Sequence, residues 1–245
     1  MIVERTLTEH HGGYRHEWVG YGASFAVVDG QEATVVDETW TQNTYRLHPE
    51  RVTGKVVVDL GACFGAFTMA ALRMGARRVL AVEPEPANYA RLLDTLDRNG
   101  VRGDAVVRTS QGAVGYRGLR YRTVGTGVCA HTAPPEGTVY PGEAPVLVGL
   151  ADVVAAAGGS QVDFLKCDVE GGEYGLVLDA EPGVLGLVGF IAMEWHGQGL
   201  APSSVAQPYE STDTVGNLVQ HLLWTHHVEV SGTPDVGGML YATRR

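Results

Sequence analysis

From about residue 51 to the C-terminal end, short β-branched runs alternate with segments of helical period. This alternation is typical of parallel strands joined by crossover helices. It predicts seven strands in one sheet, at 56–58, 79–82, 105–107, 162–167, 188–193, 228–230 and 239–242. Only eight residues separate the last two runs, which is too few for a crossover helix, so these strands should pair antiparallel at one edge.

The segments between the strands carry apolar residues at helical spacing. Pro86 fits the first turn of one helix, Asn99-Gly100 fits the end of the same helix, and Ser211-Thr212 fits the start of the last one. The pattern predicts helices over 67–74, 89–96, 150–157 and 215–222.

Two regions depart from this alternation. Residues 112–145 are rich in Gly, Thr and Pro and keep little period, which indicates a hairpin or loop excursion. Residues 1–50 predict a β-hairpin arm, with strands at 25–28 and 34–36 around Asp29-Gly30. We assign this arm and residues 51–245 to one and the same domain.

Composition narrows the class of protein. With 44% apolar and 19% charged residues, the 245-residue chain can bury one sizeable core. Its longest uncharged apolar stretch, 182–193, is shorter than the ~18 residues that cross a bilayer, and its N-terminus lacks a signal-peptide pattern. We therefore expect a soluble cytoplasmic protein with reduced cysteines. The net charge of -10 argues against nucleic-acid partners, which are usually bound by basic surfaces.

Polar residues follow the first two predicted strands. The first ends in Asp59-Leu60-Gly61-Ala62-Cys63-Phe64-Gly65, a D-x-G-x-x-x-G turn whose glycines let a ligand approach the backbone. The second ends in Glu83, whose carboxylate can accept hydrogen bonds from both hydroxyls of a ribose. Because ligands of open parallel sheets bind beyond the carboxyl ends of the strands, the two features together predict a nucleoside site.

Charge separates two classes of nucleoside cofactor. A dinucleotide fingerprint would read G-x-G-x-x-G and place a pyrophosphate over the helix N-terminus, where Asp59 would repel it. S-adenosylmethionine has no phosphate and carries an ammonium group and a sulfonium, which carboxylates attract. The turn therefore favours S-adenosylmethionine, and a nicotinamide-dependent oxidoreductase is the alternative.

Three segments together resemble one protein family. They are 56–65 with the D-x-G-x-x-x-G turn, 81–84 with Glu83, and 163–173, which reads DFLKCDVEGGE. The third is the most specific, and the set resembles the FkbM family of S-adenosylmethionine-dependent methyltransferases from about Gln42 onward. The resemblance implies an α/β class I methyltransferase fold, Rossmann-like, with a seven-stranded mostly parallel sheet and an antiparallel edge strand. It also implies methyl transfer to a hydroxyl of a small molecule, such as a specialised metabolite or a sugar.

The same resemblance implies a cofactor site. Its acidic and glycine residues would lie beside the methionine moiety, Glu83 on the ribose, and two residues after the third strand near the adenine. Asp168 would close the site from the fourth strand. The implied set is Asp59, Gly61, Ala62, Gly65, Glu83, Pro84, Gln111, Ala113 and Asp168.

A hydroxyl acceptor needs a base within hydrogen-bond reach. Asp168 and Glu170 flank the end of the fourth strand, and Glu194 and His196 the end of the fifth, so all four can overhang one crevice. We expect His196 to be the base, because its ordinary pKa of ~6.5 suits proton acceptance at neutral pH. By the two-residue period of strands, Lys166 shares a side with Asp168 and can pair with a carboxylate there.

Several alternatives stay open at this point. Asp168, Glu194 and His196 could hold Mg²⁺ against the acceptor, although we predict no metal. Methylation at nitrogen, a macromolecular acceptor and a non-catalytic binding module of the same fold are further readings. As partners we expect a hydroxyl-bearing small molecule and neither nucleic acid nor membrane, and a homo-oligomer is compatible with the sequence.

Overall fold

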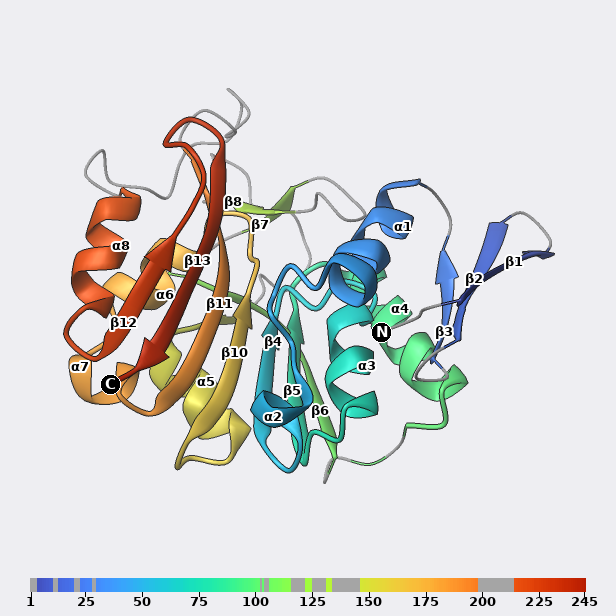
Figure 1. Ribbon diagram of the computed structural model, residues 1–245, viewed down its shortest axis with the longest axis horizontal. Helices are drawn as coiled ribbons and strands as arrows, with labels where there is room; N and C mark the ends of the chain where they lie inside the picture. Colours follow the sequence, from blue (N-terminus) through green and yellow to red (C-terminus); the bar gives the residue numbers. More distant parts are fainter. Residues whose placement is uncertain are drawn as a thin grey trace.

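The computed structural model describes residues 4–10, 13–19, 23–27, 30–101, 103, 106–115, 122–124, 131–133, 146–197 and 214–245. Its centre is an eight-stranded sheet of order β12-β13-β11-β10-β4-β5-β6-β9 (Figure 1). The strands are β4 (Val56–Leu60), β5 (Arg78–Glu83), β6 (Val107–Val114), β9 (Val146–Val148), β10 (Val162–Cys167), β11 (Val188–His196), β12 (His226–Val230) and β13 (Gly237–Arg244).

All strands of this sheet run parallel except β13, which is antiparallel to both of its neighbours. Apart from the short β9, the seven strands that the sequence predicts follow one another across the sheet in the order 3-2-1-4-5-7-6. This is the order of the Rossmann-like class I methyltransferase fold.

Two details of the predicted sheet need correction. The antiparallel strand is not at the edge, because β12 pairs beyond it and β13 fills the position between β12 and β11. The third predicted strand, at 105–107, is displaced, since β6 begins only at Val107 and continues to Val114. By contrast, the strand over 162–167 and the helix over 150–157 have the predicted bounds.

Helices cover both faces of the sheet (Figure 1). Val57 of β4 packs with one apolar cluster and its neighbours Val56 and Val58 with the other, because successive side chains of a strand point to opposite faces. Both faces are buried, as expected for a parallel sheet. The first cluster includes residues of α1 (Gly30–Asp37), the π-helix η1 (Glu38–Gln42), α2 (Pro49–Val52), α3 (Ala66–Arg73) and α4 (Pro86–Arg98); the second includes residues of α5 (Leu150–Ala157), α6 (Glu173–Leu178), α7 (Pro182–Leu185) and α8 (Val215–Leu222).

The predicted N-terminal hairpin is wrong in its second strand. Residues 34–36 lie in α1, where the hydroxyl of Thr34 donates to the carbonyl of Gly30 at 3.0 Å and Val36 is fully buried. Tertiary burial of Val36 outweighs the strand propensity of this β-branched run. The first predicted strand overlaps β3 (Ala23–Val27), which pairs instead with β2 (Gly13–Val19), and β2 pairs with β1 (Glu4–His10), in a separate antiparallel sheet.

The region predicted as a hairpin or loop excursion contains a short antiparallel pair, β7 (Arg122–Val124) with β8 (His131–Ala133). The rest of 116–145 lies outside the described residues, as does the predicted cap Ser211-Thr212. Helix α8 begins instead after Thr214, whose hydroxyl accepts from the main-chain N–H of Asn217 at 3.3 Å. Among the described helices, none has the length and apolar character needed to cross a membrane.

Candidate functional site

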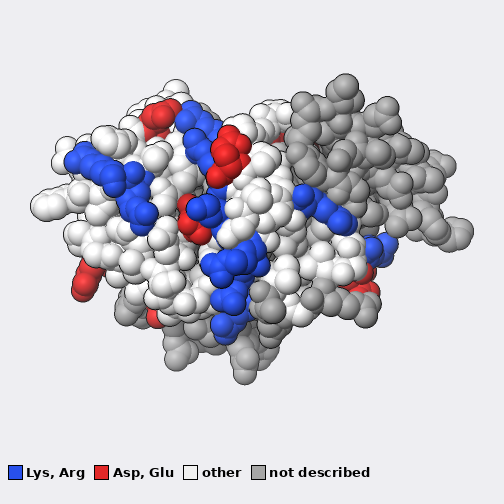
Figure 2. Space-filling model, turned by 60° about the horizontal axis from the view of Figure 1, so that its bottom comes forward, with Lys and Arg blue, Asp and Glu red and all other residues white. Residues whose placement is uncertain are grey.

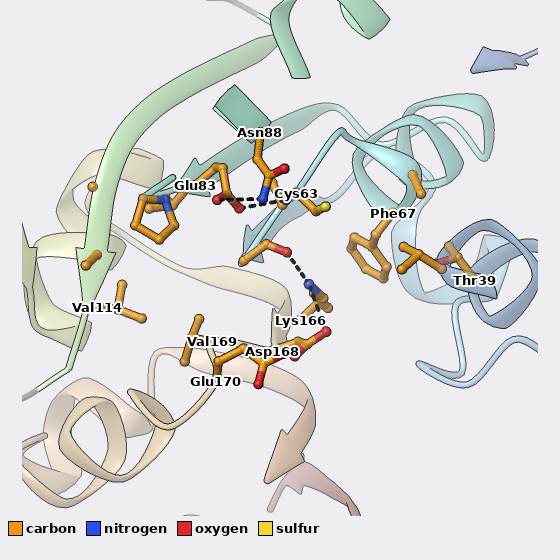
Figure 3. A pocket seen from close by; sticks show the side chains of 18 of the residues that line it. Thr39, Cys63, Phe67, Glu83, Asn88, Val114, Lys166, Asp168, Val169 and Glu170 are labelled. Carbon is orange, nitrogen blue, oxygen red and sulfur yellow. Dashed lines mark hydrogen bonds and ion pairs between the residues drawn. The ribbon is translucent and has the colours of Figure 1, made fainter. Parts of the chain in front are cut away.

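A cavity opens at the carboxyl ends of β4, β5, β6 and β10, where the topology of an open parallel sheet places ligands. The space it encloses is about 780 Å³ when the open solvent at its mouth is counted. Figure 3 shows Glu83 and Asn88 on one wall and Lys166, Asp168 and Glu170 on the opposite wall. Lys166, Asp168 and Glu170 of the predicted catalytic set thus line the same cavity as the predicted nucleoside site.

The turn after β4 forms the floor of this cavity and depends on its glycines. Gly61 has a φ of +72°, and a Cβ at this position would lie 1.7 Å from the carbonyl oxygen of Asp168. The main-chain N–H groups of Gly61 and Ala62 both donate to the carbonyl of Val82 at 3.0 Å. The loop is therefore drawn against β5 and β10, which leaves its backbone facing the cavity.

Glu83 lines the cavity as predicted and also braces the turn. One carboxylate oxygen accepts from the main-chain N–H of Cys63 at 2.8 Å, and the other accepts from that of Glu85 at 2.9 Å. Burial raises the pKa of Glu83, and these two N–H groups oppose the rise because they stabilise the charged form. Pro84, Gly61, Ala62 and Ala113 of the predicted cofactor set also line the cavity.

Three residues of the predicted cofactor set do not reach the cavity. Asp59 is fully buried beneath the turn, where its carboxylate accepts from the Thr68 hydroxyl at 2.6 Å. Gln111 is exposed on β6, because that strand starts and ends later than the sequence indicates, and Gly112, Ala113 and Val114 occupy the cavity wall instead. Gly65 lies behind the turn, close to Leu92 of α4.

Lys166 ties the turn to β10. It lies in register with Asp59 on the neighbouring strand, and its Nζ donates to the carbonyls of Leu60 at 3.1 Å and Gly61 at 2.6 Å. The same ammonium is 3.4 Å from Asp59 and 3.8 Å from Asp168. Burial alone would lower the pKa of Lys166, but these two carboxylates outweigh it and raise the pKa. Lys166 is thus a fixed positive charge that organises the site.

Three of the predicted catalytic groups, Asp168, Glu170 and His196, come together, and Glu194 is close enough for their charges to act on its pKa. Nε2 of His196 is 3.4 Å from a Glu170 oxygen, and Nδ1 is 3.2 Å from a Glu173 oxygen. That Glu173 oxygen also accepts from the main-chain N–H of His196 at 2.7 Å, and the other Glu173 oxygen accepts from that of Gly171 at 2.8 Å. Glu173 therefore joins the turn after β10 to the end of β11.

The charge of His196 differs from the one that proton acceptance requires. Burial would lower its pKa, but Glu173, Glu170 and Asp168 outweigh burial and raise the pKa to about 10. The imidazole is therefore protonated at neutral pH and is not the free base that we expected. Burial raises the pKa of Glu170 to about 7, and burial together with Asp168 raises that of Glu194 to about 7. These two carboxylates titrate where a general base should.

The N-terminal segment contributes residues that the sequence did not indicate. Val35, Thr39 and Tyr45 line the cavity, and the hydroxyl of Tyr45 donates to Asp168 at 2.9 Å. Burial and then the charge of Asp168 raise the pKa of Tyr45. These residues belong to no motif, and only the packing of α1 and η1 against α3 brings them to the site. Asn88 was also missed, although its place in the first turn of α4 follows from Pro86.

Residues 198–213, which follow the end of β11, lie outside the described residues. Cys63 and Cys167 are free thiols, the first partly buried and the second fully buried.

Comparison with known proteins identifies the family. The model of the methyltransferase FkbM domain matches residues 59–199, more than half of the chain. The matched region contains both the D-x-G-x-x-x-G turn and the K-x-D-V-E-G-x-E segment. None of the curated proteins compared with this sequence matches it.

Solved structures match the chain at low identity. A methyltransferase FkbM from Methylobacillus flagellatus KT is 19% identical with a TM-score of 0.42, over 77% of this chain and 43% of that one. This chain therefore spans less than half of that relative. Magnesium protoporphyrin IX methyltransferase from Synechocystis PCC 6803, with bound SAH, is 11% identical with a TM-score of 0.45, over 87% of this chain and 81% of that one. By its match over residues 59–199, the chain belongs to the FkbM family of S-adenosylmethionine-dependent methyltransferases.

Proposed function

We propose that this methyltransferase transfers the methyl group of S-adenosylmethionine to a hydroxyl of a small molecule, a specialised metabolite or a sugar. The observation that carries the proposal is the charge of the cavity. Glu83, Asp168 and Glu170 line it, and Lys166, the one basic residue that the described part of the chain contributes to the lining, is bound to main-chain carbonyls and carboxylates. Such a lining attracts a cationic donor, and the charge of Lys166 is already engaged by these partners.

The residues present fit this cofactor. A Cβ at Gly61 would fill the space between the turn and Asp168, so the turn holds its close approach only with glycine. Gly61 and Ala62 would hold the methionine moiety, Glu83 the ribose, and Ala113 the adenine. When bound, S-adenosylmethionine supplies a methyl group activated by a sulfonium, so the chain must orient the acceptor and accept its proton.

We propose that a carboxylate accepts the proton of the acceptor hydroxyl. Glu170 lines the cavity, and its carboxylate faces the charged imidazole of His196 at 3.4 Å. Glu170 and Glu194, each with a pKa of about 7, can accept the proton of a hydroxyl at neutral pH, whereas protonated His196 holds Glu170 in place. His196 thus becomes a positioning residue in this mechanism.

Calorimetric titration of the purified protein tests the cofactor. We expect binding of S-adenosylmethionine and of S-adenosylhomocysteine, and none of NAD. Binding of NAD without either of the others would contradict the proposal.

Incubation with donor labelled in its methyl group tests the acceptor. An extract of the source cells is separated by size before incubation, and we expect the label in the small-molecule fraction as an alkali-stable methyl ether. Label confined to protein or RNA, or found on nitrogen, would show that the acceptor is not a hydroxyl of a small molecule. It would leave the methyltransferase assignment intact.

A further inference from the structure

Three side chains with metal-binding atoms converge at the acidic end of the cavity. Asp168 and Glu170 follow β10, and His196 ends β11, so two neighbouring strands supply them. One ligand atom from each residue lies within 4.8 Å of the other two. We propose that these residues bind one divalent cation of the class that accepts both oxygen and nitrogen ligands, such as Mn²⁺.

The support behind His196 is a separate observation that points to a cation. Glu173 is fully buried, and one of its oxygens lies 2.7 Å from the main-chain nitrogen of His196 and 3.2 Å from Nδ1. This contact fixes the ring so that Nε2 faces Glu170. A buried carboxylate on one ring nitrogen, with the other nitrogen turned toward further ligands, is the usual support of a metal-binding histidine.

Asp168 is supported in a similar way. Tyr45 donates to Oδ2 of Asp168 at 2.9 Å, and Lys166 is 3.8 Å from the same oxygen. Both interactions use Oδ2, so a cation can take Oδ1. Rigidly held ligands are a property that cation sites share, since preorganisation reduces the entropy lost on binding.

The position of the cation gives it a role, which rests on the proposed function. Asp168 and Glu170 line the cavity, so a cation held by them lies next to the acceptor. There it would lower the pKa of the acceptor hydroxyl. With Glu170 and His196 bound to the cation, Glu194 is the carboxylate left to accept the hydroxyl proton. As the oxygen forms a bond to the methyl carbon, the carbon–sulfur bond breaks with its electron pair left on sulfur.

Binding of Mn²⁺ to the full-length protein tests the site without any acceptor. After dialysis against EDTA and removal of the chelator, the protein is titrated with Mn²⁺, and free Mn²⁺ is measured by its electron paramagnetic resonance signal. We expect one Mn²⁺ site per chain and competition by Mg²⁺.

Matched variants distinguish Mn²⁺ binding at this site from nonspecific binding to acidic side chains. Glu170→Gln keeps the shape of the side chain and removes a ligand charge, and we expect it to weaken Mn²⁺ binding at least tenfold. Glu173→Gln, which removes the charge behind His196 without removing a proposed ligand, should weaken binding by ~10-fold to 100-fold. Glu50→Gln removes an equivalent charge at an exposed position of α2 and should leave binding unchanged. Circular dichroism confirms that each variant is folded.

Two results would overturn the cation site. One is equal Mn²⁺ affinity in the parent protein and in folded Glu170→Gln, and the other is full methyl transfer in the presence of EDTA. Both leave S-adenosylmethionine binding untouched, so they reject the cation and keep the proposed function. Loss of S-adenosylmethionine binding in the parent protein would instead reject the proposed function.

Discussion

Gly61 is the residue whose substitution separates steric crowding from backbone strain. Gly61 and Gly54 share a φ of +72°, but a Cβ at Gly54 would meet nothing within 4 Å, whereas at Gly61 it would meet the carbonyl oxygen of Asp168 at 1.7 Å. Gly54→Ala should cost about 1 kcal/mol of unfolding free energy, from the left-handed backbone alone. Gly61→Ala should cost about 1–3 kcal/mol more, because that carbonyl must move.

Urea unfolding measures the two costs, and calorimetry measures the cofactor. Because the moved carbonyl belongs to the cavity floor, Gly61→Ala should also weaken S-adenosylmethionine binding at least tenfold, with Gly54→Ala unchanged. Equal affinities in both variants would show that the turn does not contact the cofactor.

Lys166 and Lys55 are the two lysines of the chain, and they lie in opposite environments. Lys166 is buried against Asp59 and Asp168, whereas Lys55 is 47% exposed and 3.8 Å from Asp163. Lys166→Met leaves buried Asp59 without its ammonium partner and should lower the unfolding free energy by about 3–5 kcal/mol. Lys55→Met should change it by less than about 1 kcal/mol. Urea unfolding of both variants is the measurement, and similar losses would mean that Lys166 does not carry the buried charge balance.

At the scale of elements, η1 connects the N-terminal segment to the Rossmann-like core. Trp40 of η1 is buried, stacks edge-on with Phe25 at 5.6 Å, and its indole N–H donates to the carbonyl of Ala66 at 3.0 Å. Trp40→Ala should therefore cost about 3–5 kcal/mol. Trp224 is 75% exposed, and Trp224→Ala should change stability by less than about 0.5 kcal/mol. Thermal unfolding monitored by circular dichroism compares them, and a small effect of Trp40→Ala would show that η1 is not part of the cooperative core.

The elements that the sequence predicts well are those whose local pattern agrees with their final environment. The strand over 162–167 is buried on both faces, and α5 over 150–157 has a continuous apolar stripe, so periodicity alone locates them. The local pattern of residues 34–36 does not agree with their environment, because this β-branched run lies in α1, where Val36 packs into the core. No local pattern reports such a packing partner.

The same reasoning applies to the site. Glu83 and Asp168 were predicted because each follows a strand, and parallel strands bring their carboxyl ends together. Tyr45 was missed because its contact with Asp168 joins residues 123 positions apart in the chain. The expectation that His196 is a free base does not take account of Glu173 as the partner of its ring. That contact depends on how α6 packs against β11.

At the scale of the whole molecule, charge is divided between the two edges of the sheet. Lys55, Arg77 and Arg78 lie at the amino-terminal ends of β4 and β5, and Figure 2 shows Lys and Arg gathered on the face seen from that side. The carboxyl-terminal edge holds Glu83, Asp168 and Glu170. These three cations thus lie at the edge opposite to the cavity, and Lys166, which does line the cavity, is paired with Asp59 and Asp168.

His226 should contribute to the pH dependence of the unfolding free energy. His226 is the buried first residue of β12, with Nε2 at 2.9 Å from the carbonyl of Val188 and Nδ1 at 2.7 Å from the hydroxyl of Thr225. Burial lowers its pKa, the Val188 carbonyl opposes this, and the positive charge of Arg244 lowers it further. The imidazole is therefore neutral in the folded chain at a pH where the unfolded chain already binds a proton.

The different protonation of His226 in the folded and unfolded chain decides whether it makes stability rise or fall with pH. Below the ordinary histidine pKa of ~6.5 the unfolded state gains a proton that the folded state resists, so His226 makes stability fall as pH falls. Carboxylates with raised pKa, such as Glu194, act in the opposite direction, and comparison of the parent protein with His226→Gln cancels them. We expect the variant to be less stable at pH 7.5, where the His226 contacts are intact, and the difference in unfolding free energy to shrink at pH 5. Urea unfolding at both pH values measures it, and a constant or growing difference would show that His226 is protonated in the fold.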